Sequence, residues 1–132
     1  MKPDKSQPQK FSVRKRLASF RFAFSGIKHA LLHEHNFRLH LVATLISVAA
    51  GFYFDINKTD WLILVFAIGF VLIAELFNSA IELIADFISP GKHETIGKIK
   101  DISAGAVLIA VLISVIAGTM VFWPYVEQIV RK

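Results

Sequence analysis

The 132-residue sequence contains no cysteine, which excludes disulfide bonds and thiolate metal sites. It has no G-x-x-x-x-G-K-[ST] loop, so nucleotide binding is not visible from any common motif. The first twelve residues, MKPDKSQPQKFS, lack the apolar core that a cleavable signal peptide requires. Because this segment is polar and contains proline, we expect residues 1–12 to form a disordered tail.

Hydrophobic residues are abundant: they make up 55% of the chain, against roughly 45–50% in an ordinary soluble domain. The length is enough for one domain, which we place at residues 13–132. The net charge of +5 and the pI near 9.7 suit binding either to nucleic acid or to an anionic membrane surface. Since the apolar content is so high, we expect a membrane protein with no nucleic-acid partner.

Three apolar stretches predict membrane-crossing helices, at about 36–54, 61–88 and 102–126. The last carries no formal charge and exceeds the about 20 residues that a bilayer core requires. In residues 13–33, apolar side chains recur at spacings of three and four, with basic side chains mostly elsewhere. This pattern predicts an amphipathic helix in the membrane interface, the alternative being a soluble helix that packs on a partner. The predicted fold is all-α, a polytopic membrane protein with an N-terminal amphipathic interfacial helix and three transmembrane helices.

The distribution of basic residues predicts the orientation. Of the 15, twelve lie either before Leu39 or between the second and third spans, and three lie on the other side. By the positive-inside rule, the N-terminus is cytoplasmic and the C-terminus lies outside. All the Trp and Tyr side chains fall at the predicted outer boundary, where amphipathic rings are enriched; they are Tyr53, Trp61, Trp123 and Tyr125.

The segment AELFNSAIELIAD, residues 74–86, places polar side chains inside the second predicted span. In a helix they share one face about 100° wide; they are Glu75, Asn78, Ser79, Glu82 and Asp86. An acid in mid-membrane costs at least about 2.5–3.5 kcal/mol, so three of them imply a cation, a metal or a water-filled cleft. Ion pairs with neighbouring helices are the alternative, but no Lys or Arg lies within the apolar stretches of the other two spans. We therefore expect this acidic face to be functional.

The depth of these acids predicts where the site lies. At about 1.5 Å per residue from the outer boundary, Glu82 reaches the cytoplasmic headgroups and Glu75 lies slightly deeper in the membrane. Glu34, just before the first span, arrives at the same boundary, as do Lys100 and Asp101 just before the third. We therefore expect these segments to form one site.

The residue types narrow the chemistry of that site. Carboxylates at a wet interface suit Mg²⁺, which keeps several waters and takes phosphate oxygens as further ligands. Lys100 can hold a phosphate as a point charge. Glu75 suits a general base acting on a group presented from the lipid, such as a hydroxyl. The residues alone predict metal–phosphate chemistry at the inner leaflet.

Three segments resemble one known family. ELFNSAIELIAD resembles the E-x-x-N-[ST]-A-I-E-x-x-x-D signature of the small bacterial integral-membrane lipid kinases, the diacylglycerol kinase and undecaprenol kinase family. IGKIKDISAGAVLIA resembles its K-D-x-x-A-G-A-V-L segment, and EHNFRLH resembles its E-x-N-F-x-x-H segment. The likeness covers about residues 14–124, and the last two elements are more similar to the undecaprenol-kinase branch.

The resemblance implies a homotrimer in the bacterial inner membrane, with active sites shared between subunits, that uses ATP and Mg²⁺ to phosphorylate a lipid hydroxyl. Carried over by position, Glu75 is the catalytic base, and Glu34 with Glu82 are the metal ligands. The remaining positions are expected to bind nucleotide or to support the site; they are Asn78, His93, Lys100 and Asp101 for nucleotide, and Ser79 and Asp86 for support.

Three questions stay open at this level. Arg14, Lys15 and Arg16 compete for the register of the family's arginine on the interfacial helix. Undecaprenol is favoured over diacylglycerol as the acceptor, but the sequence does not show the shape of the lipid that fits. The alternative function is a non-enzymatic membrane oligomer, cation-conducting or regulatory, although the stretch 61–74 is apolar nearly all round, which favours a pocket over a channel.

Overall fold

The computed structural model describes residues 12–91 and 93–131, apart from the side chains of residues 13–17. The predicted tail, residues 1–12, therefore lies outside the described residues except for Ser12. The described chain forms four helices, which are α1 (Val13–His33), α2 (His35–Tyr53), α3 (Lys58–Ile88) and α4 (Glu94–Val130). The all-α prediction is confirmed. The structure also leaves open the choice among Arg14, Lys15 and Arg16, whose side chains it does not describe.

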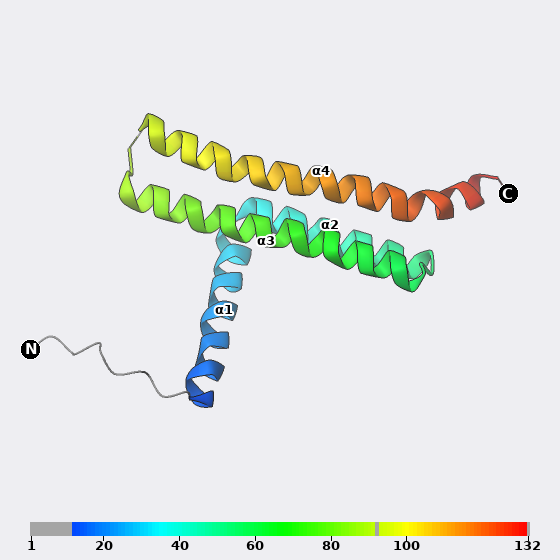
Figure 1. Ribbon diagram of the computed structural model, residues 1–132, viewed down its shortest axis with the longest axis horizontal. Coiled ribbons are helices and arrows are strands. Elements are labelled where there is room, and N and C mark those ends of the chain that lie inside the picture. The colour runs from blue at the N-terminus through cyan, green and yellow to red at the C-terminus, as the bar shows by residue number, and fades with distance from the viewer. Residues whose placement is uncertain (1–11, 92, 132) are drawn as a thin grey trace, which may run out of the picture.

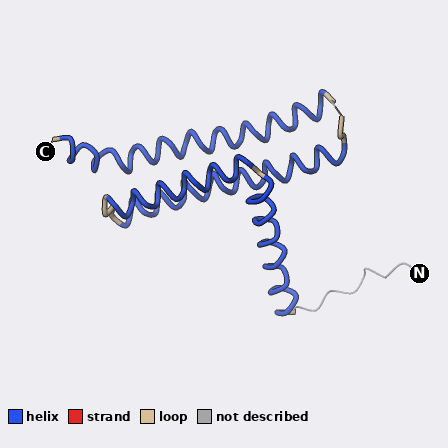
Figure 2. Tube along the Cα trace, turned by 180° about the vertical axis from the view of Figure 1, so that it is seen from behind, coloured by secondary structure: helices blue, strands red, loops and turns tan. Residues whose placement is uncertain are grey.

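Helices α2, α3 and α4 run along one direction, and α1 stands across them (Figure 1). The view from behind shows the same arrangement, with α1 meeting the other helices partway along α3 (Figure 2). Helix α3 contacts each of the other three helices. The bundle of α2, α3 and α4 thus has two ends. We refer to them as the α2–α3 end and the α3–α4 end, after the connections found there.

The break between α1 and α2 falls at Glu34, whose extended backbone (φ −95°, ψ 114°) interrupts the two helices. Its backbone N–H still donates to the Ala30 carbonyl at 2.8 Å, which closes α1, while its side chain makes no cap hydrogen bond to α2. Since α1 and α2 meet at a steep angle (Figure 1), this residue occupies the corner between them. The carboxylate of Glu34 is therefore held at the level where α1 meets the bundle.

A cluster that we name the α2–α3 clasp closes the opposite end of the bundle. Asn57 caps α3, because its Oδ1 accepts from the backbone N–H groups of Thr59 (2.9 Å) and Asp60 (3.0 Å). The Tyr125 hydroxyl of α4 donates to Asp60 Oδ2 at 2.7 Å, and Asn57 Nδ2 donates to the same oxygen at 2.6 Å. Beneath these polar groups lies the apolar core of the fold, made of Ile56, Leu64 and Val121. The clasp joins α4 to the α2–α3 turn.

Removing the Tyr125 hydroxyl is expected to loosen this clasp. Phenylalanine keeps the ring that packs on the apolar core and removes the donor to Asp60. The hydroxyl also accepts from the Asn57 backbone N–H at 3.2 Å and from Asn57 Nδ2 at 3.3 Å. We expect Tyr125→Phe to lower the free energy of unfolding by at least about 1 kcal/mol, the usual net value of one hydrogen bond. Thermal melting of the purified protein in detergent measures this change. An unaltered melting curve would show that the hydroxyl contributes nothing to the clasp.

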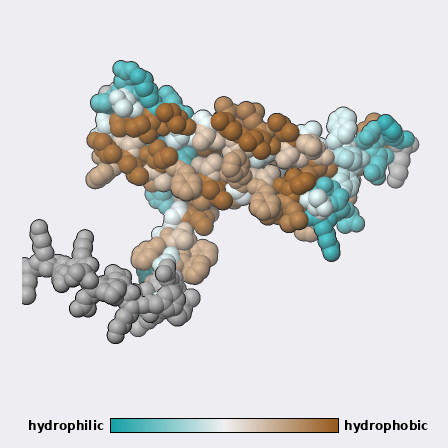
Figure 3. Space-filling model, viewed as in Figure 1, coloured by the Kyte–Doolittle hydropathy of each residue, from teal (hydrophilic) through white to brown (hydrophobic). Residues whose placement is uncertain are grey.

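On the face seen in Figure 3, apolar residues cover much of the length of the bundle, and hydrophilic residues gather toward its two ends. In the part of the chain that the structure describes, α3 and α4 are the helices long and apolar enough to cross a membrane. Helix α2, with 19 residues, extends for about 28 Å, which is close to the thickness of a bilayer core. Its crossing of the membrane, as the first of the three predicted spans, remains a prediction.

Candidate active site

The acidic face of α3 is turned into the protein. Glu75, Asn78 and Ser79 are buried, with exposed fractions of 2%, 5% and 5%. Glu82 is half-buried, and Asp86, nearest the α3–α4 end, is exposed. The large apolar side chains on the other sides of this segment are exposed, namely Phe77, Leu83 and Ile84. Helix α3 therefore buries Glu75 with its polar neighbours and presents hydrocarbon on its other sides, as expected for a functional group inside a membrane.

The carboxylate of Glu75 is incompletely satisfied. Its Oε2 is the one buried side-chain polar atom, among the described residues, without a hydrogen-bond partner. The carboxylates of Glu82 and Glu34 both lie close enough to act on Glu75 electrostatically, and both do so repulsively. A free acceptor among mutually repelling acids is an environment that a cation stabilises. The structure thus brings together the three glutamates that sequence reasoning selected from two separate segments.

These acids fit a hard divalent cation that shares its ligands with water and phosphate. Within residues 12–91 and 93–131, no three His, Cys, Asp or Glu side chains are close enough together to hold a metal by themselves. Mg²⁺ does not require such a cage, because it usually keeps several waters and takes one or two carboxylates with substrate phosphates. The repulsion among Glu34, Glu75 and Glu82, together with the unpartnered Glu75 oxygen, is compatible with this kind of site.

A chain of hydrogen bonds connects Glu82 to α4. Asn78 Nδ2 donates to Glu82 Oε1 at 3.1 Å, and the Ser103 hydroxyl of α4 donates to Asn78 Oδ1 at 2.6 Å. We name these three residues the Ser103–Asn78–Glu82 chain. Sequence reasoning missed Ser103, which is 6% exposed. Its position three residues after Lys100, at the start of an otherwise apolar stretch, is the signal that could have identified it.

Other predicted residues line a hollow of about 480 Å³ at the α3–α4 end. Lys100 Nζ donates to Asp86 Oδ1 at 2.9 Å, which joins α3 to α4, and Glu82 also acts on Lys100 electrostatically. His93 precedes the first turn of α4 and lines the same hollow. Asp101 is exposed and does not belong to the lining of the hollow. The structure therefore groups Asp86, His93 and Lys100 and leaves Asp101 outside both groups.

A second hollow, of about 570 Å³, separates α1 from α3 near the buried acids. Its α3 side includes Leu76 and Ser79, one and four residues after Glu75, and its α1 side includes Gly26 and Ala30. The lining residues are mostly apolar or small, and no acid is among them. This hollow offers an apolar molecule an approach toward the level of Glu75.

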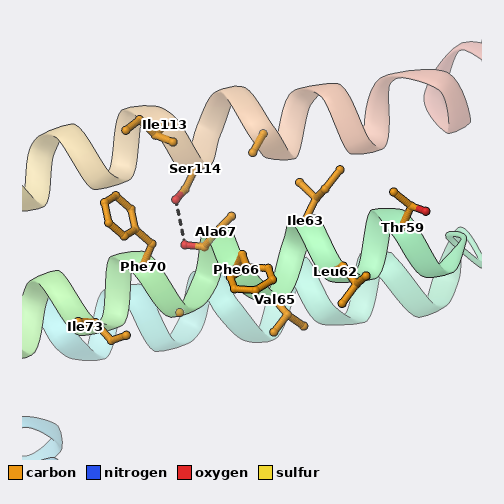
Figure 4. A pocket seen from close by; sticks show the side chains of 12 residues that line it. Thr59, Leu62, Ile63, Val65, Phe66, Ala67, Phe70, Ile73, Ile113 and Ser114 are labelled. Atoms are coloured by element: carbon orange, nitrogen blue, oxygen red, sulfur yellow. Dashed lines mark hydrogen bonds between the residues drawn. The ribbon is translucent and has the colours of Figure 1, made fainter.

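Toward the α2–α3 end, an apolar groove of about 600 Å³ lies between α3 and α4 (Figure 4). Its lining comes from residues 59–73 of α3 and 113–117 of α4. No charged side chain lines it, and its one cross-helix hydrogen bond runs from the Ser114 hydroxyl to the Ala67 carbonyl, at 3.0 Å. A cation pathway along these helices would need polar groups at this level too. This groove is too apolar to serve as such a pathway, whereas a hollow of about 250 Å³ between α2, α3 and α4 is lined in part by His40, Thr44 and Ser47.

Residues 21–122 match the family model of the prokaryotic diacylglycerol kinases. The chain belongs to this family. It is 33% identical to a diacylglycerol kinase of Escherichia coli (strain K12) over 104 residues, which are 79% of this chain and 85% of that protein. It is 35% identical to an undecaprenol kinase of Bacillus subtilis (strain 168) over 106 residues, 80% of this chain and 86% of that protein. As a member of the prokaryotic diacylglycerol kinase family, the chain is a lipid kinase.

The region matched by the prokaryotic diacylglycerol kinase family contains every site residue selected from the sequence, from Glu34 to Asp101. It also includes most of α1 and all but the last residues of α4. The segment with Arg14, Lys15 and Arg16 lies before the match. The family assignment thus covers both groups of polar residues and both hollows at the α3–α4 half of the bundle.

Proposed function

We propose that the chain transfers the γ-phosphate of ATP to the hydroxyl of a membrane lipid, with undecaprenol preferred to diacylglycerol. The observation that carries this proposal is the buried Glu75 carboxylate, whose Oε2 has no partner. The α1–α3 hollow, which is mostly apolar, approaches its level from one side, and the hollow with Asp86, His93 and Lys100 lies beyond it at the α3–α4 end. In this arrangement the lipid hydroxyl can approach Glu75 from the apolar hollow, and ATP can approach it from the aqueous side.

In the proposed reaction, Glu75 removes the proton of the lipid hydroxyl as that oxygen attacks the γ-phosphorus. The bond from the γ-phosphorus to the oxygen that bridges it to the β-phosphate breaks, so the products are the lipid phosphate and ADP. Positioning and electrostatic stabilisation carry most of the catalysis in such transfers. Glu34 and Glu82 would hold Mg²⁺, which when bound neutralises the charge on the phosphates.

The nucleotide is assigned to the α3–α4 end. Lys100 carries the positive charge that suits a phosphate, and its bond to Asp86 fixes the position of its ammonium group. His93 lines the same hollow, and Asn78 contacts the proposed metal ligand Glu82. Asp101 follows Lys100 on α4, and we propose that it contributes to nucleotide binding from the rim. Ser79 supports the base, since its hydroxyl donates to the Glu75 backbone carbonyl at 3.0 Å.

The acceptor and the assembly are proposed on separate grounds. The preference for undecaprenol rests on the elements EHNFRLH and AGAVLIA alone. Overall identity to the two named kinases is nearly equal, at 33% and 35%, and does not separate the two acceptors. A homotrimer in the bacterial inner membrane, with the α3–α4 end at the cytoplasmic side, agrees with the charge distribution. It would also cover part of the exposed apolar surface of α3 and α4 with neighbouring copies.

A competition assay tests the proposal directly. The purified protein is given labelled ATP, Mg²⁺, and undecaprenol and diacylglycerol together in mixed micelles. We expect more label in undecaprenol phosphate than in phosphorylated diacylglycerol. An excess of label in diacylglycerol would reverse the acceptor preference and leave the kinase assignment intact. No transfer to either lipid would contradict the proposed reaction and favour a regulatory membrane oligomer.

A further inference from the structure

We propose that Ser103 is a positioning residue of this site: it orients the Asn78 amide so that the amide holds the Glu82 carboxylate ready for the metal. This inference rests on the proposed function, since it assumes that Glu82 is a ligand of Mg²⁺. It is carried by the buried Ser103–Asn78–Glu82 chain, with O···O and N···O distances of 2.6 and 3.1 Å. Ser103 lies on α4, whereas Asn78 and Glu82 lie on α3.

The direction of the chain follows from which atoms can donate. An ionised Glu82 carboxylate accepts hydrogen bonds only, so the side of the Asn78 amide that faces it must be the NH₂ group. The Asn78 Oδ1 then points the other way and needs a donor, because the residue is only 5% exposed. The Ser103 hydroxyl is that donor, at 2.6 Å. The carboxylate sets which end of the amide it meets, and the Ser103 hydroxyl satisfies the other end in that orientation.

The Ser103 hydroxyl has a competing acceptor in its own helix. The Lys100 carbonyl lies 2.9 Å from Ser103 Oγ, the usual partner of a helical serine three residues later. The shorter distance to Asn78 favours the bond across to α3. The neighbouring cross-helix bond from Lys100 to Asp86 lies nearer the α3–α4 end, by about one turn on α4 and about two turns on α3. These two links fix α4 against α3 on either side of Glu82, so the serine is held where it can reach the amide.

Losing the hydroxyl should disturb the metal ligand and leave the fold intact. Without Ser103 Oγ, the Asn78 Oδ1 is buried without its donor, and rotation of the amide to find another partner removes the NH₂ group from Glu82. The carboxylate then keeps its charge but loses the bond that orients it. Removing groups that orient a metal ligand typically costs about 10- to 100-fold in metal affinity. We expect Ser103→Ala to weaken metal binding by about tenfold.

Two variants separate positioning from packing. Ser103→Thr keeps a hydroxyl at the same place and should restore metal binding to within about twofold to threefold of the wild type, a small part of the loss expected for alanine. Ser114→Ala is the matched control, because Ser114 also donates from α4 to α3, at 3.0 Å to the Ala67 carbonyl, in the apolar groove of Figure 4. It removes a cross-helix hydroxyl about three turns away from Ser103 and should leave metal binding unchanged.

The experiment measures Mn²⁺ binding to the purified full-length protein by electron paramagnetic resonance, in the presence of a non-hydrolysable ATP analogue. Lipid phosphorylation by the wild type is measured on the same preparation. The inference is supported if Ser103→Ala binds Mn²⁺ more weakly than the wild type, Ser103→Thr restores the binding, and Ser114→Ala binds Mn²⁺ as the wild type does. Equal Mn²⁺ binding by the alanine variant and the wild type overturns it, as does an equal loss in Ser114→Ala. A wild type that binds Mn²⁺ but phosphorylates no lipid contradicts the proposed function instead.

Discussion

Replacing Glu75 by glutamine is expected to reduce lipid phosphorylation by about 100- to 10,000-fold, the range contributed by a positioned general base. Glutamine has nearly the same size as glutamate and cannot take the proton of the lipid hydroxyl. The change also removes one of three mutually repelling acids, since Glu82 and Glu34 both act repulsively on Glu75. The protein should therefore remain folded. Transfer of labelled phosphate and thermal melting, measured on the same sample, check both parts.

The informative control keeps the same chemical change and moves it away from the site. Glu127→Gln alters a half-buried acid near the end of α4, far from the site, that pairs with Arg131. It should phosphorylate lipid at the wild-type rate. Binding of a non-hydrolysable ATP analogue should survive in Glu75→Gln, because the base contacts the acceptor and not the nucleotide. Wild-type turnover by Glu75→Gln would refute the assigned base.

Replacing Glu82 by glutamine is expected to raise the Mg²⁺ concentration for half-maximal activity by more than about 100-fold. Removing a group that only hydrogen-bonds to a metal ligand lowers metal affinity by up to about 100-fold. Removing the ligand itself should lower it further. The carbonyl of glutamine can still accept the hydrogen bond from Asn78 Nδ2, now 3.1 Å from Glu82 Oε1. The substitution thus removes the charge and preserves the contact. A titration of phosphorylation with Mg²⁺ measures the shift.

Glu34→Gln should move the Mg²⁺ titration in the same direction, because the two acids are proposed to share the metal from separate helices. The double variant should be no more active than the weaker single one. The acid near the other end of α4, Glu127, again supplies the control. If Glu82→Gln shows the Mg²⁺ dependence of the wild type, then Glu82 is not a ligand. The half-buried acid would then need another explanation.

The acidic face could be predicted from the sequence because it depends on one helix alone. Helical spacing places Glu75, Asn78 and Ser79 together, and the cost of acids in an apolar helix requires that they be covered. The structure buries all three and leaves Asp86, at the end of the helix, exposed. The convergence of Glu34 with this face was also predictable, since the predicted spans return the chain to the same level.

Contacts between helices could not be predicted in the same way. The bond from Ser103 to Asn78 depends on how far α4 is shifted along α3, and neither helix's own pattern sets that shift. The same holds for Tyr125 and Asp60, which are far apart in the sequence and adjacent in the clasp. Lys100 shows the intermediate case. Its level was predicted, but its pairing with Asp86 was not.

If α1 lies in the membrane interface, as we expect from its sequence, its position across the bundle would set the depth of the reaction in the membrane. Its hollow meets α3 at Leu76, Ser79, Ala80 and Leu83, whereas α3 continues to Ile88 and α4 starts at Glu94. With α1 at the boundary between hydrocarbon and water, the last turns of α3 and the first turn of α4 would project beyond it into the water. Two reactants that do not mix, one dissolved in each phase, can then meet without either leaving its own solvent. The angle between α1 and the bundle would thus keep Glu75, the proposed base, near the boundary between the two phases.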